Sequence, residues 1–213
     1  MKTVCALVLC LILSFYLCSC TASISHLGKM DFKNEALAYM EEKYGETFTW
    51  ESPVDGMFGR EEASGYVSCS SFPGEKIMVS GIQEGEVHTF SDNYLEYLFN
   101  EEATQTLQNL IDGKVECRII CKPSQTPRNI DYREDITVME YLQIGGVLAN
   151  VIFPEAPADR DAAMEQIRQL LWEQGISANM SVYFGDKSNI AAETWSGRFI
   201  MDKEGKYAVS RWR

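Results

Sequence analysis

One apolar run near the start of the chain limits which residues can take part in a folded domain. Lys2 precedes a run from Val4 to Leu17 in which only Ser14 is not apolar. A helix that spans a bilayer needs about 20 apolar residues, so this run is short for a span and has the length typical of an export signal. No second run of this length follows in the sequence. We therefore expect residues 1–19 to be a signal peptide that takes no part in the fold.

The end of that run carries a more specific pattern. Leu17-Cys18-Ser19-Cys20 has a leucine three residues before a cysteine and a small residue directly before it. This pattern resembles the lipobox of bacterial lipoproteins. The resemblance implies that a diacylglycerol is attached to Cys20, that the chain is cleaved before this residue, and that acyl chains such as palmitate anchor it to the membrane. Two or more acyl chains hold a protein stably on a bilayer. The alternative is ordinary cleavage near Ala22, which would release a soluble protein.

Composition then sets the class of the remaining chain. Apolar residues make up 46% of the sequence and charged residues 23%, which suits a globular fold. We expect residues 20–30 to form a lipid-anchored tether and residues 31–213 to form a single extracytoplasmic domain. The net charge of −12 argues against nucleic-acid binding, which needs clustered Lys and Arg.

The periodicity of apolar residues predicts an α+β fold. Apolar residues recur with helical spacing over 31–44, and they alternate with polar residues over 115–122, as in a strand. The run 147–153 is apolar on both faces, which is typical of a central strand. Ser91 and Asp92 are expected to cap a long helix that ends at Gly113. Further helices are predicted over 136–143 and from Asp159 to Gly175, and hairpins over 66–82 and 195–212. We expect a largely antiparallel sheet with three to four helices packed on one face.

Three cysteines remain after the signal and the expected lipidation site. Cys117 and Cys121 would lie about 13 Å apart on a strand, beyond the roughly 7 Å limit for a disulfide. A disulfide in an exported domain would therefore join Cys69 to Cys117 or Cys121. The alternative is that all three are small buried apolar residues. We expect no metal site, because this spacing does not chelate zinc and no histidine is near.

Motifs for catalysis are missing from the sequence, so we expect no enzyme and no cofactor. Ser91-Asp92-Asn93 matches one element of penicillin-recognising enzymes, but the chain has no S-x-x-K. His26 falls in the tether and His88 in a predicted strand. The acidic doublets at 41–42, 61–62 and 101–102 could pair for glycoside hydrolysis, although a solvated surface is their usual role.

The C-terminal hairpin is the remaining candidate for recognition. Trp195, Arg211 and Trp212 are of the types that dominate binding hot spots, and they are also common in cores. In general character the chain resembles the small uncharacterised lipoproteins of Firmicutes, particularly gut Clostridia. This resemblance implies a location on the extracytoplasmic face of the cell membrane.

We therefore expect a membrane-anchored binding or interaction module that contacts membrane lipid through acylated Cys20 and has an envelope protein as a partner. One alternative is a cell-surface hydrolase, in which two acidic residues would meet in a cleft. The other is an accessory or immunity-type lipoprotein of an envelope or transfer complex, which would expose a broad apolar patch.

Overall fold

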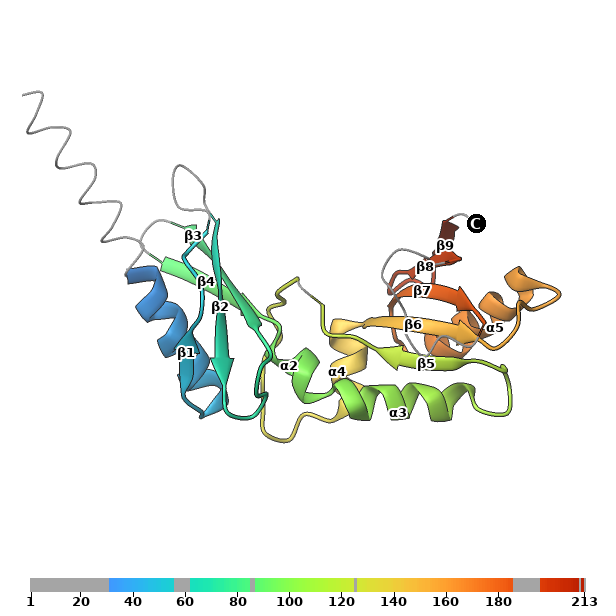
Figure 1. Cartoon of the computed structure of the whole chain (residues 1–213), viewed down its shortest axis with the longest axis horizontal. Helices are drawn as coiled ribbons and strands as arrows, with labels where there is room; N and C mark the ends of the chain where they lie inside the picture. The colour runs from blue at the N-terminus through green and yellow to red at the C-terminus, as the bar shows by residue number, and fades with distance from the viewer. Residues whose placement is uncertain are drawn as a thin grey trace, which may run out of the picture. The chain divides into compact units, whose positions relative to one another are not determined.

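The computed structural model describes residues 31–55, 62–84, 87–124, 126–185, 196–210 and 212. The chain divides into two compact units, of which the first ends at Asp92 and the second begins at Asn93. Each unit has its own sheet (Figure 1). The α+β class and the dominance of antiparallel pairing are confirmed. A single domain was expected over 31–213, but the residues instead form two units, because each sheet buries its own core.

The elements follow in chain order. The strands are β1 (Phe48–Trp50), β2 (Glu62–Cys69), β3 (Ile77–Glu84), β4 (Val87–Asp92), β5 (Arg118–Cys121), β6 (Val147–Phe153), β7 (Ala178–Phe184), β8 (Gly197–Met201) and β9 (Tyr207–Ser210). The helices are one over residues 31–44, α2 (Tyr94–Leu98), α3 (Asn100–Ile111), α4 (Val138–Gly145) and α5 (Arg160–Glu173).

The first unit is an antiparallel sheet of order β1-β2-β3-β4 packed against the helix over 31–44. Phe32 of this helix is fully buried and contacts the Trp50 ring edge-on, with 6.2 Å between centroids. A Cβ at Gly81 of β3 would lie 2.8 Å from the Phe32 ring and 2.9 Å from that of Phe90. The glycine therefore allows two aromatic rings to lie directly on the strand.

Asp92, the last residue of β4, ties this sheet to the helix over 31–44. Tyr39 Oη and Lys43 Nζ each donate to its Oδ2 at 2.8 Å, and Tyr44 Oη donates to its Oδ1 at 2.7 Å. The Asp92 side chain is only 2% exposed. Taking a charge out of water costs several kcal/mol. The hydrogen bonds and the ion pair to both oxygens of Asp92 offset this cost.

The predicted helix cap at Ser91 and Asp92 is wrong, because both residues belong to β4. Their side chains already have partners: the Ser91 hydroxyl lies 2.9 Å from that of Ser80, and the Asp92 carboxylate faces the first helix. The helical segment begins instead after Asn93 and is interrupted at Phe99, which separates α2 from α3. The helix expected from Asp159 is α5, and Asp159 caps it by accepting from the Ala162 N–H at 2.9 Å.

The second unit has a sheet of order β5-β6-β7-β8-β9. β6 and β7 are parallel, and the other neighbours are antiparallel. Parallel strands need a crossover connection, which α5 supplies. Val151 and Ile152, whose side chains point to opposite faces of β6, are both buried. The prediction that 147–153 forms a central strand is confirmed, and so is the hairpin of β8 and β9.

Helix α3 protects the outer edge of β5. The Gln108 side chain accepts from the Ile119 N–H at 3.0 Å and donates to the Cys117 carbonyl at 3.2 Å, while Thr104 Oγ1 accepts from the Cys121 N–H at 2.9 Å. These side chains satisfy backbone groups that an edge strand otherwise leaves unpaired. The strand is shorter than the predicted 115–122, because the Val115 N–H bonds to the Ile111 carbonyl at the end of α3.

We predict that Asp92→Ala lowers the stability of the first unit by about 3 kcal/mol, because Lys43 and the hydroxyls of the half-buried Tyr39 and Tyr44 lose the carboxylate that accepts from them. Hydrogen exchange in rising urea, followed by mass spectrometry of peptides from β2 and β3, measures the change. Glu41→Ala also removes one negative charge, from an exposed position of the helix over 31–44, and serves as the control. Unchanged protection of β2 and β3 in the Asp92 variant would contradict this role.

Candidate functional site

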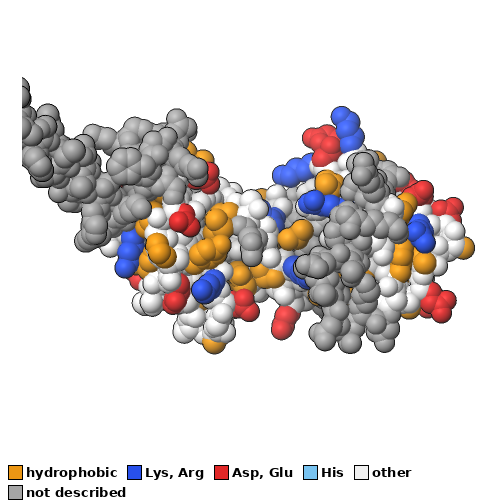
Figure 2. All heavy atoms as spheres, turned by 45° about the horizontal axis from the view of Figure 1, so that its top comes forward, with side chains coloured by type: hydrophobic (Ala, Val, Ile, Leu, Met, Phe, Trp, Pro, Cys, Tyr) orange, Lys and Arg blue, Asp and Glu red, His pale blue; other side chains and the backbone are white. Residues whose placement is uncertain are grey.

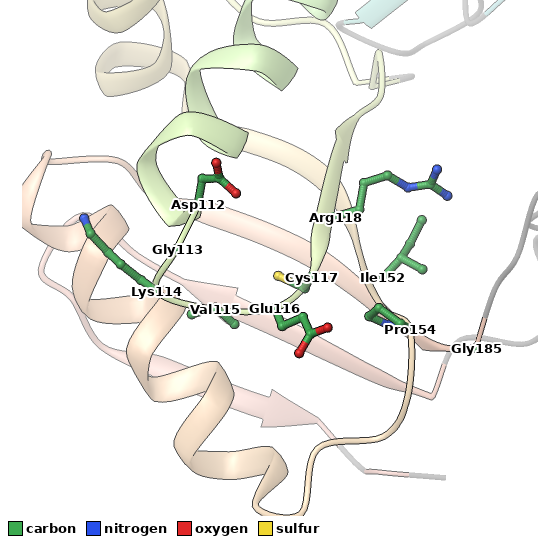
Figure 3. A pocket seen from close by; sticks show the side chains of 10 residues that line it. All are labelled: Asp112, Gly113, Lys114, Val115, Glu116, Cys117, Arg118, Ile152, Pro154 and Gly185. Carbon is green, nitrogen blue, oxygen red and sulfur yellow. The ribbon is translucent and has the colours of Figure 1, made fainter.

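A cavity of about 750 Å³ lies at one edge of the second sheet (Figure 3). Pro154 directly follows β6, and Gly185 directly follows β7. Arg118 begins β5, which is antiparallel to β6, so its start lies at the same edge. Ligands of sheets with parallel strands commonly bind outside the carboxyl ends of those strands. We call this cavity the β6–β7 cleft; its lining residues are Asp112, Gly113, Lys114, Val115, Glu116, Cys117, Arg118, Ile152, Pro154 and Gly185.

Four charged side chains alternate in sign along the segment that lines the cleft. Asp112, Lys114, Glu116 and Arg118 are all exposed. Figure 3 shows them extending from the continuous segment that leads from α3 into β5. The end of β6 adds the buried Ile152 and the exposed ring of Pro154, and the end of β7 adds Gly185. The cleft therefore offers both signs of charge beside the ring of a proline.

The thiol in this cleft is protonated at neutral pH. Burial raises the pKa of Cys117 to about 12, and it raises the pKa of Cys121 to about 11. The thiolate is the reactive form of cysteine, so a thiol with so high a pKa is a poor nucleophile. Neither cysteine is suited to covalent catalysis.

All three described cysteines are free thiols. The predicted disulfide between Cys69 and Cys117 or Cys121 is therefore not formed in this structure. Cys69 ends β2 of the first unit. In the second unit, Cys117 directly precedes β5 and Cys121 is the last residue of β5. Spacing along the sequence did not reveal that the cysteines divide between two units.

Trp212 packs within the second unit. Its ring stacks on Phe184 with 5.8 Å between centroids, and its Nε1–H donates to Asp161 Oδ1 at 2.8 Å. The Arg160 guanidinium lies 4.8 Å from the Phe184 ring centroid and 5.9 Å from that of Trp212. A Cβ at Gly197 would lie 2.7 Å from the indole, so the ring rests directly on β8. These contacts attach the C-terminal residues to the start of α5.

Several other predicted site residues fall outside the part of the chain that the structure describes. These residues are Cys20, His26, Glu61, Trp195 and Arg211. The side chain of His88, in β4, is also not described. The acidic pairs at 41–42 and 101–102 are exposed on helices.

Within the described ranges, no group of three or more His, Cys, Asp or Glu side chains is placed to hold a metal ion. No helix among these residues is long and apolar enough to cross a bilayer.

Comparisons with known proteins give one distant similarity. No family model matches this chain, and no curated protein matches it. A solved structure is similar to it: a DUF5037 family protein from Ruminococcus gnavus ATCC 29149, with 16% sequence identity and a TM-score of 0.34, where the match covers 81% of this chain and 92% of that one.

The sequence contained a partial signal for the cleft. Its alternation over 115–122 correctly placed Glu116 and Arg118 on the solvent side. Pro154 and Gly185 had no such signal, because only the pairing of β5 with β6 and of β6 with β7 brings them beside this segment.

We predict that alkylation distinguishes the three thiols. At pH 8, N-ethylmaleimide should modify Cys69 before Cys117, because burial raises the pKa of Cys117 to about 12 and leaves little of its reactive thiolate. Modification of Cys117 should accelerate as the pH rises from 6 to 8, since its thiolate fraction grows with pH. Peptide mass mapping after timed alkylation measures the order, and the urea-unfolded protein, in which all three should react, is the control. Equal rates for Cys69 and Cys117 in the native protein would contradict the burial of Cys117.

Proposed function

We propose that the protein is a lipid-anchored extracytoplasmic binding module and that the β6–β7 cleft is its binding site. The observation that carries the binding role is that four exposed charged residues, which alternate in sign along the sequence from Asp112 to Arg118, line a cavity of about 750 Å³. Ligand pockets commonly have volumes of about 300–1,000 Å³. The lipobox-like Leu17-Cys18-Ser19-Cys20 supports the anchor and the extracytoplasmic location.

The chemistry of the cleft favours a short peptide of mixed charge as the ligand. Glu116 and Arg118 lie two residues apart where the chain enters β5, whereas Asp112 and Lys114 lie in the turn after α3, where Gly113 has a φ of +68°. A short peptide that carries both an acidic and a basic side chain could place each charge next to one of opposite sign in the cleft. Such complementarity contributes mainly specificity and rate of association.

The same geometry favours binding over hydrolysis. A glycosidase needs a carboxylic acid that stays protonated near neutral pH, and burial against apolar side chains is the usual means. Asp112 and Glu116 of the cleft are both exposed. This is the reason to rank a surface hydrolase below a binding module.

An accessory lipoprotein that docks through a broad apolar patch of the second unit is also less well supported. In the view of Figure 2, hydrophobic side chains of the second unit lie scattered among charged ones. Trp172 of α5 is 50% exposed, and its ring rests against Gly205. The Arg168 guanidinium lies 5.7 Å from the centroid of the Trp172 ring. The large exposed apolar residues of this unit come from four elements: Leu98, Ile144, Trp172 and Ile200.

We predict that the protein expressed with its own signal gains the mass of acyl chains and enters the detergent phase on partitioning. Cys20→Ala should lose both properties, because it removes the sulfur that carries the diacylglycerol. Cys18→Ala changes a neighbouring cysteine in the same way and should keep both. Intact mass spectrometry and Triton X-114 partitioning are the measurements. An unmodified, water-soluble product cleaved near Ala22 would overturn the lipid anchor.

We also predict saturable binding of a fluorescein-labelled octapeptide of alternating Glu and Lys, measured by fluorescence anisotropy. Reversing both basic charges, in Lys114→Glu/Arg118→Glu, should weaken binding about tenfold or more, and added salt should weaken binding to the wild type. Lys203→Glu/Lys206→Glu makes the same charge change at exposed positions at the β8–β9 turn and should have little effect. Absence of binding, or equal weakening in both double variants, would overturn the cleft as the binding site.

A further inference from the structure

We infer that the second unit has another ligand site, a groove around Arg128 that binds the carboxylate of a small apolar ligand such as the C-terminal end of a short peptide. The groove has a volume of about 310 Å³ and lies at the amino ends of β6 and β7. We call it the Arg128 groove. Its lining includes Ser124, Arg128, Gly145, Leu148, Ser177 and Ile200.

A buried acid holds Arg128 in place. The Arg128 Nη2 forms an ion pair with Glu96 Oε1, and the Glu96 side chain is only 4% exposed. The other oxygen of Glu96 accepts the Ser124 N–H. Both carboxylate oxygens therefore have partners within the unit. A carboxylate out of water is costly unless a cation pairs with it. The buried Glu96 therefore keeps the Arg128 guanidinium beside it.

Two glycines make room for this arrangement. The Arg128 Nη1 donates to the carbonyl of Gly145, the last residue of α4, and a Cβ at Gly145 would lie 2.8 Å from Nη1. Gly146 has a φ of +70°, and a Cβ there would lie 2.3 Å from Ser177 Oγ. A larger residue at either position would displace the guanidinium or close the groove.

The guanidinium has more donors than its two bonds use. Its planar group has five N–H donors, and among the described residues the bonds to Glu96 and Gly145 use two of them. The Arg128 side chain is 23% exposed and is one of the residues that line the groove. An arginine held in a fixed plane binds a carboxylate through two parallel hydrogen bonds, and little side-chain entropy remains to be lost.

The rest of the lining indicates the class of ligand. No Asp or Glu lines the groove, although the chain has a net charge of −12. Leu148 is half-buried and Ile200 is 43% exposed, so they present apolar surface to the same groove. The hydroxyls of Ser124 and Ser177 can bond to an amide or carboxylate oxygen. A carboxylate next to an apolar side chain matches this combination.

This inference does not depend on the β6–β7 cleft or on lipidation. The two cavities share no lining residue. A negative result for one site therefore leaves the other unaffected.

Calorimetric titration with N-acetyl-leucine tests the site, with N-acetyl-leucinamide and inorganic phosphate as comparison probes. We expect N-acetyl-leucine to bind, and the amide to bind at least about tenfold more weakly, because it lacks the charge that pairs with Arg128. Phosphate should also bind more weakly, because it cannot contact Leu148 and Ile200. Absence of binding by N-acetyl-leucine, or equal binding of either comparison probe, would overturn the inference.

A variant that keeps Arg128 locates the binding. Changing Arg128 itself would leave Glu96 buried without its cation and destabilise the unit. Ile200→Glu instead adds a carboxylate at an exposed position of the groove, where it competes for the guanidinium and should weaken binding about tenfold or more. Ile144→Glu makes the same change at an exposed position of α4 outside the lining and should leave binding unchanged. Equal effects of the two variants would place the ligand elsewhere and overturn the assignment.

Discussion

The parallel pairing of β6 with β7 is the constraint on which both candidate sites depend. The two strands pair in register from Val147 with Ala178 to Phe153 with Phe184. Because they are parallel, their carboxyl ends meet at one edge of the sheet and their amino ends at the other. The β6–β7 cleft lies at the first edge and the Arg128 groove at the second. Seven residues per strand separate the two sites by about 20 Å.

Side chains that satisfy backbone groups complete this arrangement. Gln108 and Thr104 of α3 bond to the outer edge of β5, so the helix stays beside the strand and the charged segment that joins them lies along the cleft. Arg128 similarly bonds to the end of α4 at Gly145. In both places polar side chains satisfy backbone groups beside a cavity, so stability and the geometry of the candidate site depend on the same contacts.

Local periodicity predicted elements better than it predicted their surroundings. The helix over 31–44 and the central strand over 147–153 were correct, because burial of one face, or of both, leaves a regular apolar pattern. Ser91 and Asp92 have the composition of a helix cap, yet they end β4. Asp92 bonds to side chains more than forty residues away. The side chains of a short polar motif can form hydrogen bonds with many different groups. The neighbouring sequence does not predict which of these groups lies close in the fold.

Local sequence patterns predicted the types of most elements, and they support the expected anchor at Cys20, because both follow from patterns within about twenty neighbouring residues. The division into two units and the pairing of distant charges became clear from the tertiary structure. Glu96 and Arg128 are 32 residues apart and form an ion pair because α2 and the segment before α4 pack together. Pro154 and Gly185 line one cleft because their strands are neighbours. Such contacts depend on chain topology, which local hydrophobic periodicity does not contain.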